Sequence, residues 1–211
     1  FSPAQDFNGS ESFTATVTDG EYSDSDTFTV SVLAVNDAPV LASVSDVSFD
    51  EDGVGSASLS ADDVDGDELE FSITGGSFII ASIEGSNISF DAPDNFNGSE
   101  SFTVSVTDGE YTDSQSIIVT VNAVNDAPTA NAASGATNED QSVVVSLSGD
   151  DIDGDNLTFS LDTDASNGSV TVDGSFATYT PNENYNGDDS FTFTVSDGDL
   201  TAAADVTLTV T

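Results

Sequence analysis

The chain has 211 residues, of which 40 are Asp or Glu and none is Lys, Arg or His, so its formal net charge is −40. Because no side chain can neutralise a phosphate, this composition excludes direct binding to nucleic acid or to an anionic membrane surface. The lack of Cys excludes a disulfide framework, and no apolar run approaches the roughly 18 residues of a membrane span, so we expect no membrane insertion. Hydrophobic residues still make up 36% of the chain, with 14 Phe among them, which indicates a folded, β-rich protein.

The first 35 residues correspond to the end of a repeat, because "FSPAQDFNG" matches the later stretches "FDAPDNFNG" and "YTPNENYNG". We expect at most three strands here. Their alternating apolar positions include Phe13, Val17, Phe28 and Val30. Such a fragment cannot bury both faces of a sheet, and isolated hairpins are marginal in water. We therefore expect order only where strands come from earlier residues of a longer chain, or from a neighbouring copy by β-augmentation.

Further along the chain, short runs with a period of two are separated by clusters of Gly, Asn and Asp. "DELEFSIT", "SFIIASI" and "NISFDAP" have the pattern of three short strands. "SFTVSVTDG" alternates apolar and polar residues up to a turn, and "DSQSIIVTVNAV" resumes the alternation, which predicts a β-hairpin with the tip "DGEYTD". No segment shows a helical period.

The pattern repeats along the chain. "FNGSESFTATVTDGEY" at 7–22 returns as "FNGSESFTVSVTDGEY" at 96–111 and as "YNGDDSFTFTVSDGDL" at 185–200. A period of about 89 residues divides the chain into the C-terminal part of a truncated repeat and two complete domains. The predicted divisions are 1–35, 36–124 and 125–211. Seven or so short strands per repeat predict an all-β fold of tandem antiparallel immunoglobulin-like β-sandwich domains.

Two acidic motifs recur in register with this period. "VNDAP" follows Ala34 and Ala123, and "DVDGD" and "DIDGD" begin at Asp63 and Asp151. Ca²⁺ takes six to eight hard oxygen ligands, which clustered carboxylates, Asn carbonyls and backbone carbonyls supply. The Ala-Pro that follows Asn-Asp keeps each linker short and extended. The motifs therefore predict calcium sites at the joints between domains.

The order of a Glu in the first strands, "DxDG" near the middle and "VNDAP" at the end resembles cadherin repeats. More closely, it resembles the cadherin-like tandem domains of large bacterial surface or secreted adhesin-type proteins. The resemblance implies calcium between consecutive domains, held by an acidic residue of the earlier domain, the Asn-Asp linker, and the DxD of the later domain. The implied ligands are Glu51, Asn125, Asp126, Asp151 and Asp153 at the second junction, Asn36, Asp37, Asp63 and Asp65 at the first, and Glu139 at a further one.

The chain departs from the vertebrate cadherin pattern at the linkers. Ala34 and Ala123 stand where the vertebrate linker DxNDNxP has its leading Asp, and one Asn is missing. Fewer ligands imply one to three ions per junction. The further carboxylate motif before the penultimate strand is not recognisable, although Asn97 and Glu100 lie in that region.

Each of these motifs also has an interpretation that involves no metal. "VNDAP" is also a plain linker of turn-forming residues, "DxDGD" a plain acidic turn, and "TDG" or "SDG" a hairpin turn. For the function, a calcium-dependent extracellular spacer or adhesion segment competes with a self-assembling filament subunit and with a calcium-dependent polysaccharide-binding module that uses Tyr22 and Tyr111. We expect no enzyme, because the chain lacks His, Cys, Lys and Arg, and its acids recur in each repeat whereas an active site normally occurs once.

The expected location is extracellular or the cell surface. The expected partners are neighbouring repeats of the same chain, with other copies of the chain or a surface polysaccharide as further candidates. The expected bound ion is Ca²⁺.

Overall fold

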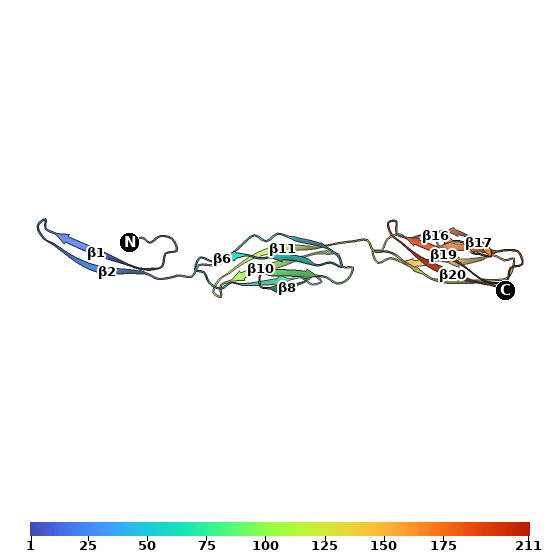
Figure 1. Ribbon diagram of the computed structural model, residues 1–211, viewed down its shortest axis with the longest axis horizontal. Helices are drawn as coiled ribbons and strands as arrows, with labels where there is room; N and C mark the ends of the chain where they lie inside the picture. The colour runs from blue at the N-terminus through green and yellow to red at the C-terminus, as the bar shows by residue number, and fades with distance from the viewer. The chain divides into compact units, whose positions relative to one another are not determined.

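A computed structural model describes all residues, 1–211, and every regular element in it is a β-strand (Figure 1). The chain divides into two compact units, Phe1–Ala123 and Val124–Thr211. The predicted all-β fold is confirmed. No helix of a length and hydropathy suited to crossing a membrane is present.

Unit 1 contains the first eleven strands. They are β1 (Gly9–Thr18), β2 (Ser23–Val32), β3 (Val40–Leu41), β4 (Val47–Asp50), β5 (Gly55–Ser58), β6 (Ala61–Asp62), β7 (Glu70–Gly75), β8 (Ile80–Glu84), β9 (Asn87–Asp91), β10 (Gly98–Thr107) and β11 (Thr112–Asn122). Strands β3 to β11 form a sandwich of two main sheets, with the orders β4-β11-β10-β7 and β5-β9-β8 and a small β3-β6 pair. All pairs are antiparallel except β4 with β11, which run parallel.

The core of this sandwich follows from the alternation seen in the sequence. On β10 the side chains of Phe102, Val104 and Val106 are at most 1% exposed, while the residues between them face outward. Phe90 of the second sheet packs edge-on against Phe102, with ring centroids 5.3 Å apart. Burying each such side chain stabilises the fold by about 1.5–3 kcal/mol, so the period-two pattern sets which face of the sheet turns inward.

Unit 2 repeats this architecture with nine strands. They are β12 (Thr129–Asn131), β13 (Ala133–Thr137), β14 (Val143–Ser146), β15 (Ser148–Asp150), β16 (Thr158–Thr163), β17 (Gly168–Asp173), β18 (Phe176–Pro181), β19 (Gly187–Ser196) and β20 (Thr201–Val210). Its sheets have the orders β13-β20-β19-β16, β14-β18-β17 and β12-β15, and β13 runs parallel to β20. Its core includes Phe191, Phe193 and Val195, all at most 2% exposed.

One carboxylate in each sandwich anchors the loop that enters the second sheet. Glu100 on β10 accepts hydrogen bonds from the backbone N–H groups of Ser77 (2.8 Å), Phe78 (3.2 Å) and Ile79 (2.9 Å). These bonds, that of Ser77 first, lower the pKa of Glu100. Glu100 is therefore a structural residue that ties the two sheets together, and this explains an acidic residue that the sequence left without a motif.

Unit 2 achieves the same anchoring with a different pair of side chains. Asp189 accepts hydrogen bonds from the N–H groups of Ser166 (3.1 Å) and Asn167 (2.9 Å), and from the hydroxyl of Tyr179 (3.0 Å). Burial, together with the nearby Asp189, raises the pKa of Tyr179. At a spacing of 89 residues, Tyr179 and Asp189 correspond to Phe90 and Glu100. The Asp189 side chain is shorter than that of Glu100, and the hydroxyl of Tyr179 supplies a hydrogen-bond donor that Phe90 lacks.

The remaining strands of unit 1, β1 and β2, form a two-stranded antiparallel sheet. The segment before Gly9 forms no strand, so the hairpin has two of the three strands expected as the maximum. Phe1 and Phe13 are in contact, with ring centroids 4.7 Å apart. Most side chains of this hairpin are exposed.

We expect Tyr179→Phe to lower the free energy of unfolding of unit 2 by about 1–2 kcal/mol, because Asp189 then loses a buried hydrogen bond. Urea unfolding followed through the amide signals of unit 2 measures this change. The matched control is Tyr185→Phe, which also deletes a hydroxyl bond, to the carbonyl of Asp188, but at an exposed site where water replaces it. Equal costs for the two substitutions would contradict the anchoring role of Tyr179.

Candidate metal centre

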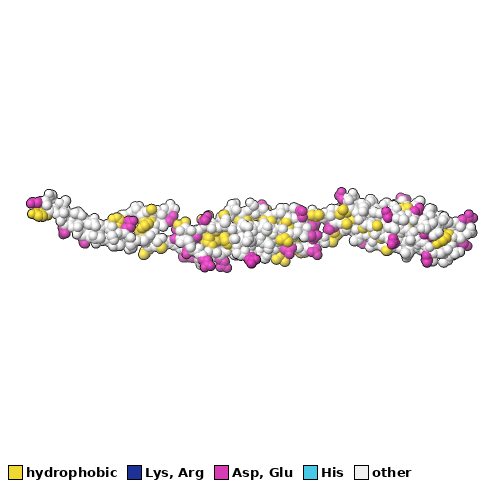
Figure 2. Space-filling model, viewed as in Figure 1, with side chains coloured by type: hydrophobic (Ala, Val, Ile, Leu, Met, Phe, Trp, Pro, Cys, Tyr) yellow, Lys and Arg dark blue, Asp and Glu magenta, His cyan; other side chains and the backbone are white.

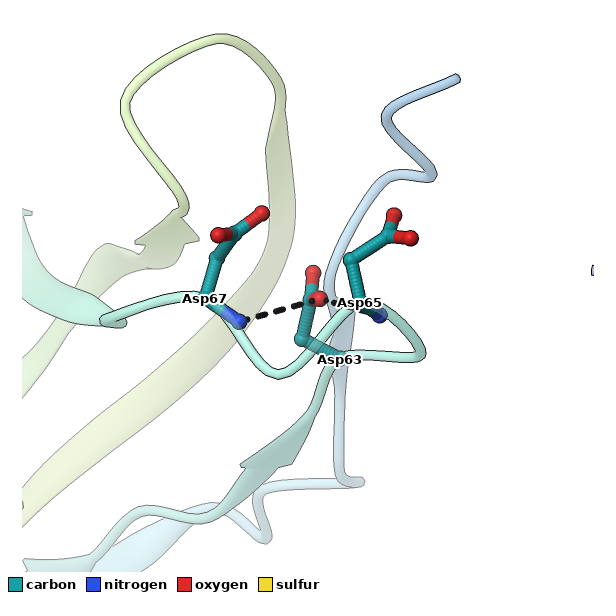
Figure 3. Close-up of side chains that lie close together, drawn as sticks. All are labelled: Asp63, Asp65 and Asp67. Atoms are coloured by element: carbon teal, nitrogen blue, oxygen red, sulfur yellow. Dashed lines mark hydrogen bonds between the residues drawn. The ribbon is translucent and has the colours of Figure 1, made fainter. Parts of the chain in front are cut away.

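An acidic loop joins β6 to β7 in unit 1 and carries Asp63, Asp65 and Asp67 (Figure 3). Oδ1 of Asp63 accepts hydrogen bonds from the N–H groups of Asp65 (2.9 Å), Gly66 (3.0 Å) and Asp67 (3.4 Å), which curls the loop around this carboxylate. Gly66 has φ of 78°, a left-handed conformation that glycine adopts at no steric cost. The turn directs all three carboxylates to one side of the loop, as Figure 3 shows.

The size of this acidic group suits a single calcium ion. One oxygen from each of Asp63, Asp65 and Asp67 lies within 4.8 Å of the other two. At Ca–O distances of about 2.3–2.6 Å, two oxygens on opposite sides of one ion are about 5 Å apart at most. Without a cation, each pair of these charges repels by on the order of 1 kcal/mol even in water-like surroundings. The residues present therefore fit a hard divalent cation.

The linker is hydrogen-bonded to the acidic loop of the domain that follows it in the sequence. The N–H of Asp37 donates to Oδ2 of Asp65 at 2.8 Å, which brings a fourth acidic residue to the group. Desolvation, followed by the charges of Asp6, Asp65 and Asp63, raises the pKa of Asp37. A raised pKa means that the ionised carboxylate is disfavoured where it stands, as expected among like charges.

A second contact fixes the Asn of the linker pair. The side-chain amide of Asn36 donates to Oδ2 of Asp108 at 2.9 Å. Asp108 lies at the tip of the β10–β11 hairpin, where its Oδ1 also accepts from the N–H groups of Glu110 and Tyr111. The N–H of Tyr111 is the largest cause that lowers the pKa of Asp108. The amide of Asn36 is thus committed to the hairpin tip, and its carbonyl oxygen is the atom it can offer to a cation.

Unit 2 reproduces both contacts. The N–H of Asp126 donates to Asp153 at 2.8 Å, and the amide of Asn125 donates to Asp197 at 3.0 Å. The acidic loop between β15 and β16 groups one oxygen each of Asp151, Asp153 and Asp155 within 4.8 Å. The same arrangement has therefore formed in two different sequence contexts.

One oxygen in each loop has an environment that points to a cation. Oδ2 of Asp63 and Oδ2 of Asp151 are shielded from solvent and have no hydrogen-bond partner. Buried polar atoms normally have a partner, because leaving one unpaired costs about 1–3 kcal/mol. Both atoms belong to the first Asp of the acidic loop, which is one of the predicted ligands.

Two predicted ligands lie away from these groups within their own units. Glu51 follows β4, is 6% exposed, and its N–H donates to the carbonyl of Asn122 at the far end of β11 from the hairpin tip. Glu139 follows β13 in the same way, and its N–H donates to Thr211. The structure therefore does not bring Glu51 to Asp37, Asp63 and Asp65. Its predicted combination with ligands of unit 2 stays a prediction.

Four residues near the acidic loops were missing from the predicted ligand set. Asp67 and Asp155 are the third carboxylates of the two loops, and the spacing "DxDGD" contained the signal for them. Asp108 and Asp197 hold the linkers, each 72 residues after the Asn it binds. The recurrence of "TDG" and "SDG" marks them as turns, which they are, but indicates nothing of their contact with the linker.

The comparisons with known proteins agree with this architecture. A family profile described as bacterial Ig domain matches residues 36–120 and 125–209. The structure of human protocadherin-24 EC1-2 is similar over 83% of this chain and 100% of that chain, with 18% identity and a TM-score of 0.57. A second structure of it matches 84% and 99%, with 17% identity and a TM-score of 0.53. The cadherin-like, immunoglobulin-like fold predicted from the sequence is confirmed.

Other comparisons add nothing on function. An endo-fucoidan hydrolase of glycoside hydrolase family 107 matches 99% of this chain with 19% identity and a TM-score of 0.36, and the chain spans only 34% of that enzyme. No curated protein sequence matches the chain.

The hydrogen bonds that attach the linkers to the hairpin tips should weaken at low pH. The pKa values of Asp108 and Asp197 are lowered by hydrogen bonds, those from the N–H groups of Tyr111 and Leu200 first. A lowered folded-state pKa means that the stabilisation is complete above the unfolded pKa of about 3.9 and is lost as the pH falls through the folded value. We expect the side-chain amide signals of Asn36 and Asn125 to move toward solvent-exposed shifts over that range in an NMR titration.

The variant Asp108→Ala should remove this response at Asn36 and leave it at Asn125, whereas Glu84→Gln, an exposed acid on β8, should change neither. Amide signals that stay constant down to about pH 2 would show that these carboxylates do not hold the linkers.

Proposed function

The chain belongs to the bacterial Ig domain family, and on this premise we propose that it is a calcium-dependent extracellular spacer or adhesion segment. The observation that carries the proposal is the acidic loop of each unit, with its three clustered carboxylates and one enclosed, unpaired oxygen, on Asp63 and on Asp151. The ion would stiffen the array of domains by occupying the points where the linkers meet the sandwiches.

The proposed ligands at each linker follow from the contacts. In unit 1 they are Asp63, Asp65 and Asp67 of the loop, with Asp37 and the carbonyl oxygen of Asn36. In unit 2 they are Asp151, Asp153 and Asp155, with Asp126 and the carbonyl oxygen of Asn125. Glu51 stays a predicted ligand of the junction that includes Asp126, and Glu139 stays a predicted ligand of a further junction. Five or six protein oxygens with added water match the coordination that calcium takes.

The role of the ion is electrostatic. Each acidic loop gathers negative charge in a chain that has no basic side chain to offset it. Figure 2 shows acidic side chains in magenta on the visible face and none in dark blue or cyan. A divalent cation relieves this repulsion and joins loop and linker in one coordination sphere. Binding to the folded state alone stabilises it by about 2.7 kcal/mol for each site when free calcium is about 100 times the dissociation constant. Linker stiffness thereby depends on the calcium concentration.

A structural role fits these residues better than catalysis. The chain contains no His, Cys, Lys or Arg, and the same acidic constellation occurs in both units. An extracellular location is part of the proposal, because calcium there is abundant enough to occupy sites of the moderate affinity typical of extracellular modules.

We expect millimolar CaCl₂ to raise the melting temperature of the chain and to narrow the distribution of shapes seen by X-ray scattering, relative to chelator. MgCl₂ at equal ionic strength controls for charge screening. Asp63→Asn should abolish binding in unit 1 and spare unit 2, because Asn keeps the Oδ1 acceptor that curls the loop and replaces only the enclosed oxygen. Asp151→Asn should do the reverse, and Glu84→Gln should change nothing. Identical scattering and melting with and without calcium would refute the proposal.

The variant Asp37→Asn separates a metal ligand from a simple surface acid. It removes a carboxylate whose pKa is raised by desolvation and by its acidic neighbours, so in chelator the melting temperature should stay the same or rise. In calcium the same variant should melt below the parent chain, because a ligand has been lost. The diagnostic result is that the variant lowers the melting temperature in calcium but not in chelator. A variant that is less stable in both, or in neither, would mean that Asp37 is not a ligand.

A further inference from the structure

Three Asn-Gly pairs occur at the same place in the repeat. Asn8, Asn97 and Asn186 each precede a glycine that begins a strand, which is β1, β10 or β19. A turn comes directly before each Asn, closed by a backbone hydrogen bond of 3.0–3.3 Å from Phe7 to Ala4, from Phe96 to Pro93, or from Tyr185 to Asn182. All three Asn side chains are exposed and lie outside the strands. The exposed Asn-Gly pair is therefore a repeated feature of the entry into this strand.

The backbone conformation requires the glycine of these pairs. Gly98 has φ of 150° and Gly187 has φ of 134°, a range that residues with a side chain rarely adopt. A Cβ atom at Gly98 would also lie 3.3 Å from Cζ of Phe96. The Asn side chains, in contrast, take part in no hydrogen bond that holds them in place. The turn thus fixes a glycine directly after an Asn whose amide is free to move.

The fourth Asn-Gly pair of the chain, Asn167-Gly168, is held differently. The N–H of Asn167 donates to Asp189 at 2.9 Å. The carbonyl of Asn167 accepts from the N–H of Asn182 at 2.8 Å and from the hydroxyl of Tyr179 at 3.3 Å. Rotation about the Cα–C bond of Asn167 moves this carbonyl and breaks both of its hydrogen bonds. The backbone of this pair is therefore fixed at the bond that must turn for its side chain to meet the next nitrogen.

From these contacts we propose that Asn8, Asn97 and Asn186 are sites of spontaneous deamidation, and that the hydrogen bonds at the fourth pair protect it. The glycine nitrogen loses its proton to water and attacks Cγ of the Asn. The new N–Cγ bond closes a five-membered imide, the Cγ–Nδ2 bond breaks, and ammonia leaves after taking up a proton. Water then opens the imide at Cγ, which gives Asp, or at the main-chain carbonyl, which gives isoaspartate. Water is the only co-reactant, and nothing is oxidised or reduced.

Each conversion alters the chain where it enters a long strand. A carboxylate replaces a neutral amide, which adds a negative charge to a chain that already has a net charge of −40. Isoaspartate also routes the main chain through Cβ and Cγ, so an extra CH₂ group lies directly before Gly98, whose pairing with Val121 begins the β10–β11 register. The modification therefore changes the end of the sandwich from which the chain continues toward the next linker. This inference is independent of the calcium proposal.

The test ages the folded 211-residue chain in mildly alkaline buffer and follows each pair by mass spectrometry. Cleavage after Glu places the four Asn-Gly pairs in four separate peptides, 1–11, 85–100, 140–183 and 184–211. The exchange of NH₂ for OH changes the peptide mass, and fragmentation separates Asp from isoaspartate. Conversion at Asn167 should be at least about tenfold slower than at the other three, because reaction there first breaks several hydrogen bonds. In denaturant the four rates should become similar, since the sequence pair is the same.

The matched variant is Asn97→Gln, an exposed substitution that keeps the amide but would have to close a larger, slower-forming ring. It should leave peptide 85–100 unconverted and the peptide of Asn186 unchanged. Equal rates at Asn167 and the other three pairs in the folded chain would overturn the proposal. A slower rate at Asn167 that persists in denaturant would also contradict it, because the folded contacts would then not be the cause. Conversion of peptide 85–100 in Asn97→Gln at the parent rate would show that another residue reacts.

Discussion

Forty carboxylates and no basic side chain leave backbone N–H groups as the main internal partners of negative charge in this protein. The turns depend on this constraint. Asp63 draws three successive N–H groups into an acidic loop, and Asp108 draws two into a hairpin tip. Hydrogen bonds to a charged acceptor are stronger than those between neutral groups, so these aspartates define local backbone conformation where a Lys or Arg partner is lacking.

The same chemistry connects elements that are distant in the sequence. Glu100 joins β10 to the loop before β8, and Asp65 joins the acidic loop to the linker. Where several carboxylates lie close together, some carboxylate oxygens have no N–H donor. The enclosed oxygens of Asp63 and Asp151 mark those places, and they coincide with the groups whose size fits a calcium ion. Local turn formation and the proposed metal binding therefore use the same residues.

Comparison of the two sandwiches shows which contacts keep the same residue types and which do not. The anchoring carboxylate is Glu in unit 1 and Asp in unit 2, and the buried aromatic beside it changes from Phe90 to Tyr179. The contacts between linker and loop, in contrast, are reproduced with the same residue types and nearly the same distances. Anchoring of the sheets tolerates different chemistry as long as the donors are satisfied. The linker ends have an unchanged set of oxygens, as the proposed coordination site would require.

The sequence by itself determined the repeat, the strands and the acidic loops. Each of these features depends on residues that are close together in the sequence. Alternation along "SFTVSVTDG" decides which side chains of β10 face inward, and "DxDGD" brings its carboxylates together within one turn. Only the tertiary structure decided that Asp108 binds Asn36 across 72 residues, that Glu100 anchors the loop before β8, and that one oxygen of Asp63 is enclosed. These contacts depend on how the packed sheets place chain ends beside loops, and no local pattern encodes the distances that sheet packing sets.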